Sequence, residues 1–418
     1  MASPSASSLA AELGVAEVRD LERLSGGASR ETWKFDAVRE DGSVDALILR
    51  RDPPGRPSVD GMMTAEATAA RACSDAGLRV PGVLVSSEAP SPWDTAGYVM
   101  QRVEGETLAR RILRDDEYAK ARTVLVEQCG EFLRGLHSLP VGSVPGIEHW
   151  DPVRVLRRNL ALAGEPTETM EFAFAWLEAN RPPDREPVIV HGDFRLGNLI
   201  VDADGLAAVL DWELLHIGNP VEDLGWLCTK AWRFGGALPV GGFATREALL
   251  DAYGGDVTLD ELRWWEVLAT LKWAIGCMGQ GAVHLRGQVR SVELAAIGRR
   301  VCEQEWDLLL LLCPEVAERH RSTAGAVAPP SELHGRPTLA ELAEALEEFL
   351  RDEVMPGTTG RLSFQARVAA NVAAMIKREV ELGASLDAGL AGGTTEERLA
   401  AQVAAKLAVA NPRYLTNP

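Results

Sequence analysis

The sequence lacks the cysteine spacing of a metal site or of a disulfide framework. Its six cysteines are scattered along the chain, and no two of them form a CxxC motif. This pattern argues against a zinc site of the common cysteine type. Scattered cysteines are instead typical of reduced, mostly buried thiols in a cytosolic protein.

Long apolar segments are also missing. No Lys or Arg precedes Arg19, and no extended apolar stretch lies near the N-terminus, which argues against a secretory signal. The longest apolar run, Leu308 to Cys313, is far shorter than the roughly 20 residues of a membrane-spanning helix. We therefore expect a cytoplasmic protein.

Positive charge is in deficit, because 43 Lys and Arg residues face 61 Asp and Glu residues and the formal net charge is −18. An acidic surface repels nucleic-acid backbones and anionic lipid, so neither partner is expected. A small phosphate-bearing ligand is still compatible with this charge, because a basic pocket can lie within an acidic shell.

The order of sequence patterns predicts an α+β protein of two or three units, as its 418 residues require. Residues 1–103 contain strand-like segments at 31–35 and 46–50, joined by a hairpin turn at 40–43, and a helical segment at 59–76. We expect this part to be a β-rich lobe, a small and mostly antiparallel sheet with one helix.

Helical patterns dominate the rest of the chain. Residues 104–321 are expected to form an α-rich lobe. A linker rich in Ala, Pro, Gly and Ser follows at 322–337. Residues 338–418 are then expected to form a helical module that begins with the capping box Thr338-x-x-Glu341. Packing, homodimerisation or contact with a partner are the roles we expect for it.

A polar motif, HGDFRLGN, directly follows a short apolar run at Val188–Val190. Asp193 and Asn198 are five residues apart, which is the frame of a kinase catalytic loop. Phosphoryl transfer needs a carboxylate to accept the proton of the attacking hydroxyl, and an amide and a second carboxylate to bind Mg²⁺. Asp211, after the next apolar run, supplies the second carboxylate.

Three stretches carry a family resemblance: HGDFRLGN, VLDWE at Val209–Glu213, and GNPVEDL at Gly218–Leu224. Over residues 20–315 the chain resembles the aminoglycoside phosphotransferase and choline kinase family. The strand end LRRDPPG at 49–55 is similar to that of the branch associated with acyl-CoA dehydrogenase-like enzymes. The resemblance implies a two-lobed, protein-kinase-like fold, ATP and Mg²⁺ as cofactors, and a hydroxylated small molecule as substrate. Residues 1–103 are then implied to be the ATP-binding N-lobe, and residues 104–321 the C-lobe with the catalytic loop and the substrate-binding helices.

The resemblance also assigns residue roles in the motif. Asp193 is implied to be the catalytic base, and Asn198 and Asp211 are implied to bind Mg²⁺. His191 and Asp223 are implied to brace the loop. We expect Arg195, two residues after the base, to stabilise charge on the γ-phosphate.

The residues expected to bind the nucleotide match known nucleotide-binding motifs less closely than the polar motif matches a catalytic loop. Gly26, Gly27 and Ser29 lie where a phosphate-covering loop is expected, although Gly-Gly more often marks an ordinary turn. The sequence contains no GxxxxGK[ST] motif, which excludes a P-loop. Adenine is expected to bind the backbone of the interlobe hinge, around Gln101 to Val103.

The lysine of the third strand in kinases has no counterpart here, because the strand ends in Arg50-Arg51. We expect Arg50 to take its role and Glu66 to pair with it, while Arg51 points to the opposite face. An ordinary surface ion pair between Arg50 and Glu66 is the alternative. Arginine keeps the charge of lysine but binds with a different geometry.

These patterns leave three functions open. An ATP-dependent small-molecule O-phosphotransferase accounts for both halves of the chain. A pseudokinase or nucleotide-binding scaffold is favoured only by the missing lysine, and a magnesium-dependent phosphohydrolase leaves the N-lobe unexplained. A hydroxyacyl-CoA, an aminoglycoside or a macrolide remain candidate acceptors, and the preference between ATP and GTP is open.

Overall fold

The structure, a computed structural model, describes residues 3–24, 30–54, 61–89, 91–321, 327, 336–388 and 392–416. The chain divides into two units. The first consists of Met1–Asp151 and Pro183–Glu266, and the second of Pro152–Pro182 and Val267–Pro418. One long helix, α9 (Leu259–Leu285), contains residues of both units.

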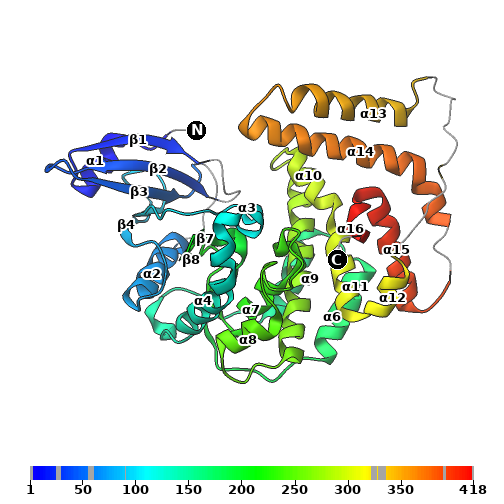
Figure 1. The fold of residues 1–418 in the computed structure, drawn as a ribbon, viewed down its shortest axis with the longest axis horizontal. Helices are drawn as coiled ribbons and strands as arrows, with labels where there is room; N and C mark the ends of the chain where they lie inside the picture. The colour runs from blue at the N-terminus through cyan, green and yellow to red at the C-terminus, as the bar shows by residue number, and fades with distance from the viewer. Residues whose placement is uncertain are drawn as a thin grey trace. The chain divides into compact units, whose positions relative to one another are not determined.

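An antiparallel sheet of five strands, in the order β1-β2-β3-β5-β4, begins the first unit (Figure 1). Two helices pack on it, α1 beside β1 and α2 beside β4 and β5. The elements are α1 (Ala6–Leu13), β1 (Glu17–Arg23), β2 (Glu31–Val38), β3 (Val44–Arg51), α2 (Met62–Asp75), β4 (Val83–Ser87) and β5 (Gly97–Gln101).

The β2–β3 hairpin was predicted from its alternating pattern and its turn. Its strands pair in register from Glu31 with Arg51 to Val38 with Val44. The odd-numbered residues of β2 are buried, with Trp33 and Phe35 in one apolar cluster. Since successive side chains of a strand point to opposite faces, this register also decides where the two arginines of β3 lie.

In and around the five-stranded sheet, helix α1 and strand β1 were not predicted. Most of β1 is exposed, and it carries charges at Glu17, Arg19 and Asp20. An edge strand with one buried face and a charged outer face has little hydrophobic alternation for a sequence pattern to detect. Its pairing with β2 is therefore visible only in the structure.

The rest of the first unit is mainly helical, with two short strand pairs, β6 with β9 and β7 with β8. Helix α4 packs against β8, β6 and α8. These elements are α3 (Ala109–Arg114), α4 (Ala119–His137), β6 (Val188–Val190), β7 (Leu199–Asp202), β8 (Gly205–Val209), β9 (His216–Gly218), α7 (Val221–Cys228) and α8 (Arg246–Tyr253). The fold class is therefore α+β, as predicted.

The described part of the second unit is helical, and the capping box predicted at Thr338 and Glu341 is present at the start of α13. Helices α13 and α14 lie side by side (Figure 1). Besides residues of α9, the helices are α5 (Pro152–Ala163), α6 (Glu168–Ala179), α10 (Val292–Arg299), α11 (Val301–Leu312), α12 (Pro314–Arg319), α13 (Leu339–Glu348), α14 (Gly360–Ala388), α15 (Thr395–Ala410) and α16 (Arg413–Thr416).

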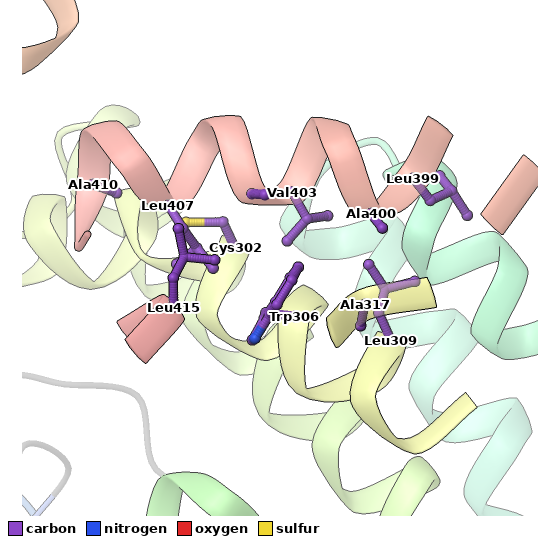
Figure 2. Close-up of a cluster of buried hydrophobic side chains, with 11 residues drawn as sticks. Cys302, Trp306, Leu309, Ala317, Leu399, Ala400, Val403, Leu407, Ala410 and Leu415 are labelled. Atoms are coloured by element: carbon purple, nitrogen blue, oxygen red, sulfur yellow. The ribbon is translucent and has the colours of Figure 1, made fainter. Parts of the chain in front are cut away.

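Helix α15 packs on α11 and α12 through a buried apolar cluster (Figure 2). Leu399, Val403 and Leu407 of α15 recur every four residues and line one face. They meet Trp306 and Leu309 of α11. The segment 338–418, which we expected to be a separate module, thus shares a hydrophobic cluster with helices that precede the linker. Its independence as a folding unit stays a prediction.

None of the helices in the described ranges is long and apolar enough to cross a membrane.

Matched Leu→Ala variants test the packing of α15. Leu407 is fully buried, so Leu407→Ala should lower the free energy of unfolding by about 2–5 kcal/mol. Leu346 of α13 is 50% exposed, and Leu346→Ala should change it by no more than about 0.5 kcal/mol. Urea denaturation measures both values, and equal losses would contradict the packing described.

Candidate active site

The loop that follows β6 is held by the buried side chain of Asp223, on helix α7. Its two carboxylate oxygens accept the backbone N–H groups of His191 and Gly192, each at 2.9 Å. Gly192 has a φ of 78°, and a Cβ there would meet the carbonyl oxygen of Leu214. A glycine is therefore required at the second position of HGDFRLGN.

Burial opposes ionisation of Asp223, but its hydrogen bonds outweigh that effect. The ring nitrogen Nε2 of His137 lies 3.2 Å from Oδ2, and the backbone N–H of His191 donates to the same oxygen. Together they hold the pKa of Asp223 below its ordinary value. The carboxylate is thus charged when it holds the loop.

His191 is fixed as a neutral ring by two backbone groups. Its Nδ1 lies 3.1 Å from the amide nitrogen of Asp193, and its Nε2 lies 3.0 Å from the carbonyl oxygen of Leu210. Because an amide N–H only donates and a carbonyl only accepts, the ring proton is on Nε2. Burial lowers the pKa of His191, which agrees with this state. His191 therefore braces the loop.

Asp193 is 7% exposed and receives three side-chain hydrogen bonds. Nε of Arg195 donates to Oδ1 at 3.0 Å, and Nε1 of Trp226 donates to the same oxygen at 2.8 Å. Nδ2 of Asn198 donates to Oδ2 at 2.6 Å and to the Asp193 carbonyl at 2.9 Å. The structure thus joins the predicted base, the predicted arginine and the predicted amide.

Asp211 is separated from the end of β8 only by Leu210. Its φ of 69° is an unusual value for a residue other than glycine. Its side chain is 23% exposed. Oδ1 of Asp211 contacts Nη2 of Arg50, so the predicted metal ligand and the predicted phosphate anchor are direct neighbours.

Arg50 and Arg51 lie on opposite faces of the sheet. Nε of Arg50 is 3.4 Å from Oε2 of Glu66 in helix α2, which is the predicted partner. Arg51 is fully buried on the other face, where its Nη2 lies 2.8 Å from Oε2 of Glu31. It also lies over the ring of Trp33, with Cζ 5.8 Å from the centroid. Arg50 therefore reaches the site, and Arg51 belongs to the packing of the sheet.

Glu66 has further partners that sequence patterns did not reveal. Nη2 of Arg30 lies 3.3 Å from Oε1 of Glu66, and the hydroxyl of Tyr98 lies 3.4 Å from Oε2. Arg30 also pairs with Asp52. Two arginines thus converge on one buried carboxylate.

The expected hinge residues differ in whether their backbone N–H groups are already hydrogen-bonded. The N–H of Gln101 donates to the carbonyl of Gly82 at 2.9 Å, as part of the sheet, so it is occupied. In the described part of the chain, no backbone hydrogen bond outside regular elements uses the N–H of Val103. The expected residues Gly26, Gly27 and Ser29 lie outside the described residues.

The oxygen donors present fit Mg²⁺. In the described ranges no group of three or more His, Cys, Asp or Glu side chains could hold a metal ion, so a metal here would need an amide, water or ligand oxygen as well. Asn198 uses its amide nitrogen on Asp193, which leaves its Oδ1 as the atom that can bind a cation. One amide oxygen and one carboxylate suit Mg²⁺, which commonly completes its shell with water and phosphate oxygens.

Trp226 is the contact to Asp193 that sequence reasoning did not identify. A tryptophan three residues after an aspartate forms no distinctive motif, so the sequence alone does not separate a role in the site from packing in the core. The available signal was its spacing from Asp223, since residues i and i+3 share one face of a helix.

A family model described as phosphotransferase enzyme family matches residues 20–265, more than half of the chain. The chain belongs to the phosphotransferase enzyme family. The match includes every described residue of the site above.

This phosphotransferase is similar to curated proteins and to solved structures. Acyl-CoA dehydrogenase family member 11 from Rattus norvegicus is 31% identical over 199 residues, which are 44% of this chain and 25% of that protein. The chain thus spans about a quarter of the length of that curated relative. The aminoglycoside 3'-phosphotransferase of Salmonella typhimurium is 27% identical over 224 residues, which are 47% of this chain and 77% of that protein.

The structure of the GDP complex of aminoglycoside 2'-phosphotransferase-IIIa matches with a TM-score of 0.52 at 13% identity. The match covers 72% of this chain and 96% of that chain. It confirms the predicted kinase-like fold of the phosphotransferase.

The neutral state of His191 predicts a pH-dependent stability. The pKa of a histidine in the unfolded chain is about 6.5, and burial lowers it in the folded state. The unfolded chain therefore binds the proton first, and stability should fall as pH decreases below about 6.5. His191→Gln should make the loss between about pH 7.5 and pH 5.5 smaller. Urea denaturation at both pH values measures it, and an unchanged loss contradicts the assignment.

Proposed function

We propose that this phosphotransferase moves the γ-phosphate of ATP to a hydroxyl group of a small molecule, with Mg²⁺ and with Asp193 as the base. The observation that carries the proposal is the contact set around Asp193 and Asp211. Asp193 is bonded to Arg195 and Asn198, while Asp211 meets the Arg50–Glu66 pair. These are the parts that positioning and charge stabilisation in phosphoryl transfer require.

Each residue has a role in this proposal. Asp193 accepts the proton of the attacking hydroxyl, and Arg195 stabilises the charge that develops on the transferred phosphate. Asn198 and Asp211 would hold Mg²⁺, which neutralises charge on the phosphates when it is bound. Arg50, oriented by Glu66, binds a nucleotide phosphate.

The nucleotide site is proposed to extend from Arg50 to the hinge. The backbone of Val103 is the favoured contact for the adenine ring, because the N–H of Gln101 is already used within the sheet. Gly26, Gly27 and Ser29 are proposed to cover the phosphates. The structural relative named above is a GDP complex, so ATP and GTP should both be tested.

The acceptor is proposed to be a hydroxyacyl-CoA or a similar hydroxylated metabolite. The similarity to acyl-CoA dehydrogenase family member 11 favours this class, and the similarity to aminoglycoside 3'-phosphotransferase keeps an antibiotic as the second class. Incubation with ATP, Mg²⁺ and a panel of hydroxyacyl-CoAs, aminoglycosides and macrolides, followed by mass spectrometry for a phosphorylated product, distinguishes them.

A catalytically weak pseudokinase, or a nucleotide-binding scaffold, is the second candidate. It is favoured by the contact between Arg50 and Asp211, because a guanidinium group there occupies one carboxylate oxygen proposed for the metal. We further propose a cytoplasmic location and a homodimer formed through the C-terminal helices.

Replacing Asp193 tests the proposed base. Asp193→Ala should lower phosphate transfer by at least about 1,000-fold, since it removes both the proton acceptor and the partner that orients Arg195 and Asn198. Binding of MgATP should be largely kept, as a thermal shift would show. Asp204→Ala, at an exposed residue of the β7–β8 turn, is the matched control. Unchanged turnover in Asp193→Ala would contradict the proposed mechanism.

Variants of the two neighbouring arginines distinguish a role in nucleotide binding from a role in folding stability. Arg50→Met should raise KM for MgATP by about tenfold or more, because a charged phosphate contact is lost. Arg51→Met should instead lower stability by about 3–5 kcal/mol, because it leaves the buried carboxylate of Glu31 without this cation. Steady-state kinetics and urea denaturation measure the two effects. The assignment fails if KM responds to Arg51→Met rather than to Arg50→Met.

A further inference from the structure

Helix α7 presents two side chains to the catalytic loop from one face. Asp223 binds the backbone N–H groups of His191 and Gly192, and Trp226, three residues later, binds the side chain of Asp193. Residues three apart lie on the same side of a helix. The helix therefore sets both the position of the loop and the orientation of its carboxylate.

The contacts around Asp193 form a closed ring of side chains. Trp226 and Arg195 both donate to Oδ1 of Asp193, at 2.8 and 3.0 Å. The guanidinium of Arg195 lies over Trp232, with Cζ 4.5 Å from the ring centroid. Trp232 packs on Trp226 with 5.4 Å between ring centroids. Each of the four side chains is thus held by two others in the ring.

Gly197 belongs to the same arrangement. A Cβ at this position would meet Nη1 of Arg195. The absence of a side chain at Gly197 leaves room for the guanidinium to lie between Asp193 and Trp232. The glycine of the motif is thus explained by the arginine two residues before it.

The two oxygens of Asp193 are left in different states. Among the residues that the structure describes, Oδ1 has two N–H donors, which use both of its lone-pair directions, while Oδ2 has one donor, Nδ2 of Asn198. A carboxylate that keeps one free lone pair can accept a proton only there.

We propose that Trp226 and Trp232 are positioning residues, which hold Asp193 and Arg195 so that Oδ2 of Asp193 takes the proton of the acceptor. This inference rests on the proposed function. In the step, the acceptor oxygen forms a bond to the γ-phosphorus and its proton passes to Oδ2. The bond from the γ-phosphorus to the bridging oxygen breaks, and that electron pair leaves with ADP.

Trp226→Phe keeps an aromatic ring and removes the N–H donor. We expect kcat for MgATP turnover, with water as the acceptor, to fall by about tenfold to a hundredfold, the usual effect of losing a hydrogen bond to a charged group. KM for MgATP should stay within about twofold, because Trp226 contacts the base and not the proposed nucleotide residues. A residue that only packs would not separate kcat from KM in this way.

Trp306→Phe is the matched control. Trp306 is fully buried in the α11–α15 cluster, and its Nε1 has no hydrogen-bond partner in the described part of the chain. The same chemical change there should leave kcat and KM at wild-type values. Thermal midpoints of both variants show whether each is folded.

Trp232→Phe is the second variant, in case Trp226→Phe does not fold. It keeps the hydrogen bond of Trp226 and reduces the aromatic surface beneath Arg195, so kcat should fall by about threefold to tenfold at constant KM. If the wild-type protein is active and kcat is unchanged in whichever of Trp226→Phe and Trp232→Phe are folded, the inference is overturned. The proposed function then still stands. A wild-type protein that turns over no MgATP, either with water or with any acceptor of the panel above, overturns the proposed function itself.

Discussion

A single buried carboxylate fixes the geometry on which the site depends. Asp223 accepts the backbone N–H groups of His191 and Gly192, and the positive φ of Gly192 turns the chain directly before Asp193. Without this acceptor two buried N–H groups would lack partners, at a cost of roughly 1–3 kcal/mol each. These two hydrogen bonds therefore hold the loop in place without a ligand, which suits the positioning role proposed for the site.

The second feature of the site is a line of alternating charges. It runs from Asp52 through Arg30, Glu66 and Arg50 to Asp211. A lysine presents one point charge, whereas the planar guanidinium of Arg50 contacts two carboxylates at once. This geometry links the proposed phosphate anchor to the proposed metal ligand, so the substitution of arginine for lysine changes more than the identity of one cation.

The motif residues and most helices could be predicted, because they depend on local spacing. Asp193, Asn198 and Asp211 are identified by short patterns, and strand alternation separates Arg50 from Arg51. Arg30 and Trp226 could not be predicted, because their contacts join segments that are 36 and 33 residues apart. Strand β1 was missed because its exposed, charged face hides the alternation. The cluster that joins α15 to α11 also depends on packing between distant segments.

The central claim, that this site binds a nucleotide through Mg²⁺, is tested most directly by calorimetric titration of the protein with ATP. The titration is made once with Mg²⁺ in excess and once with the metal chelated. We predict binding with Mg²⁺ and an affinity at least about tenfold weaker without it, since in the proposed site Asn198 and Asp211 would hold the metal that neutralises the phosphates. Equal affinity under both conditions, or no binding under either, would contradict the account.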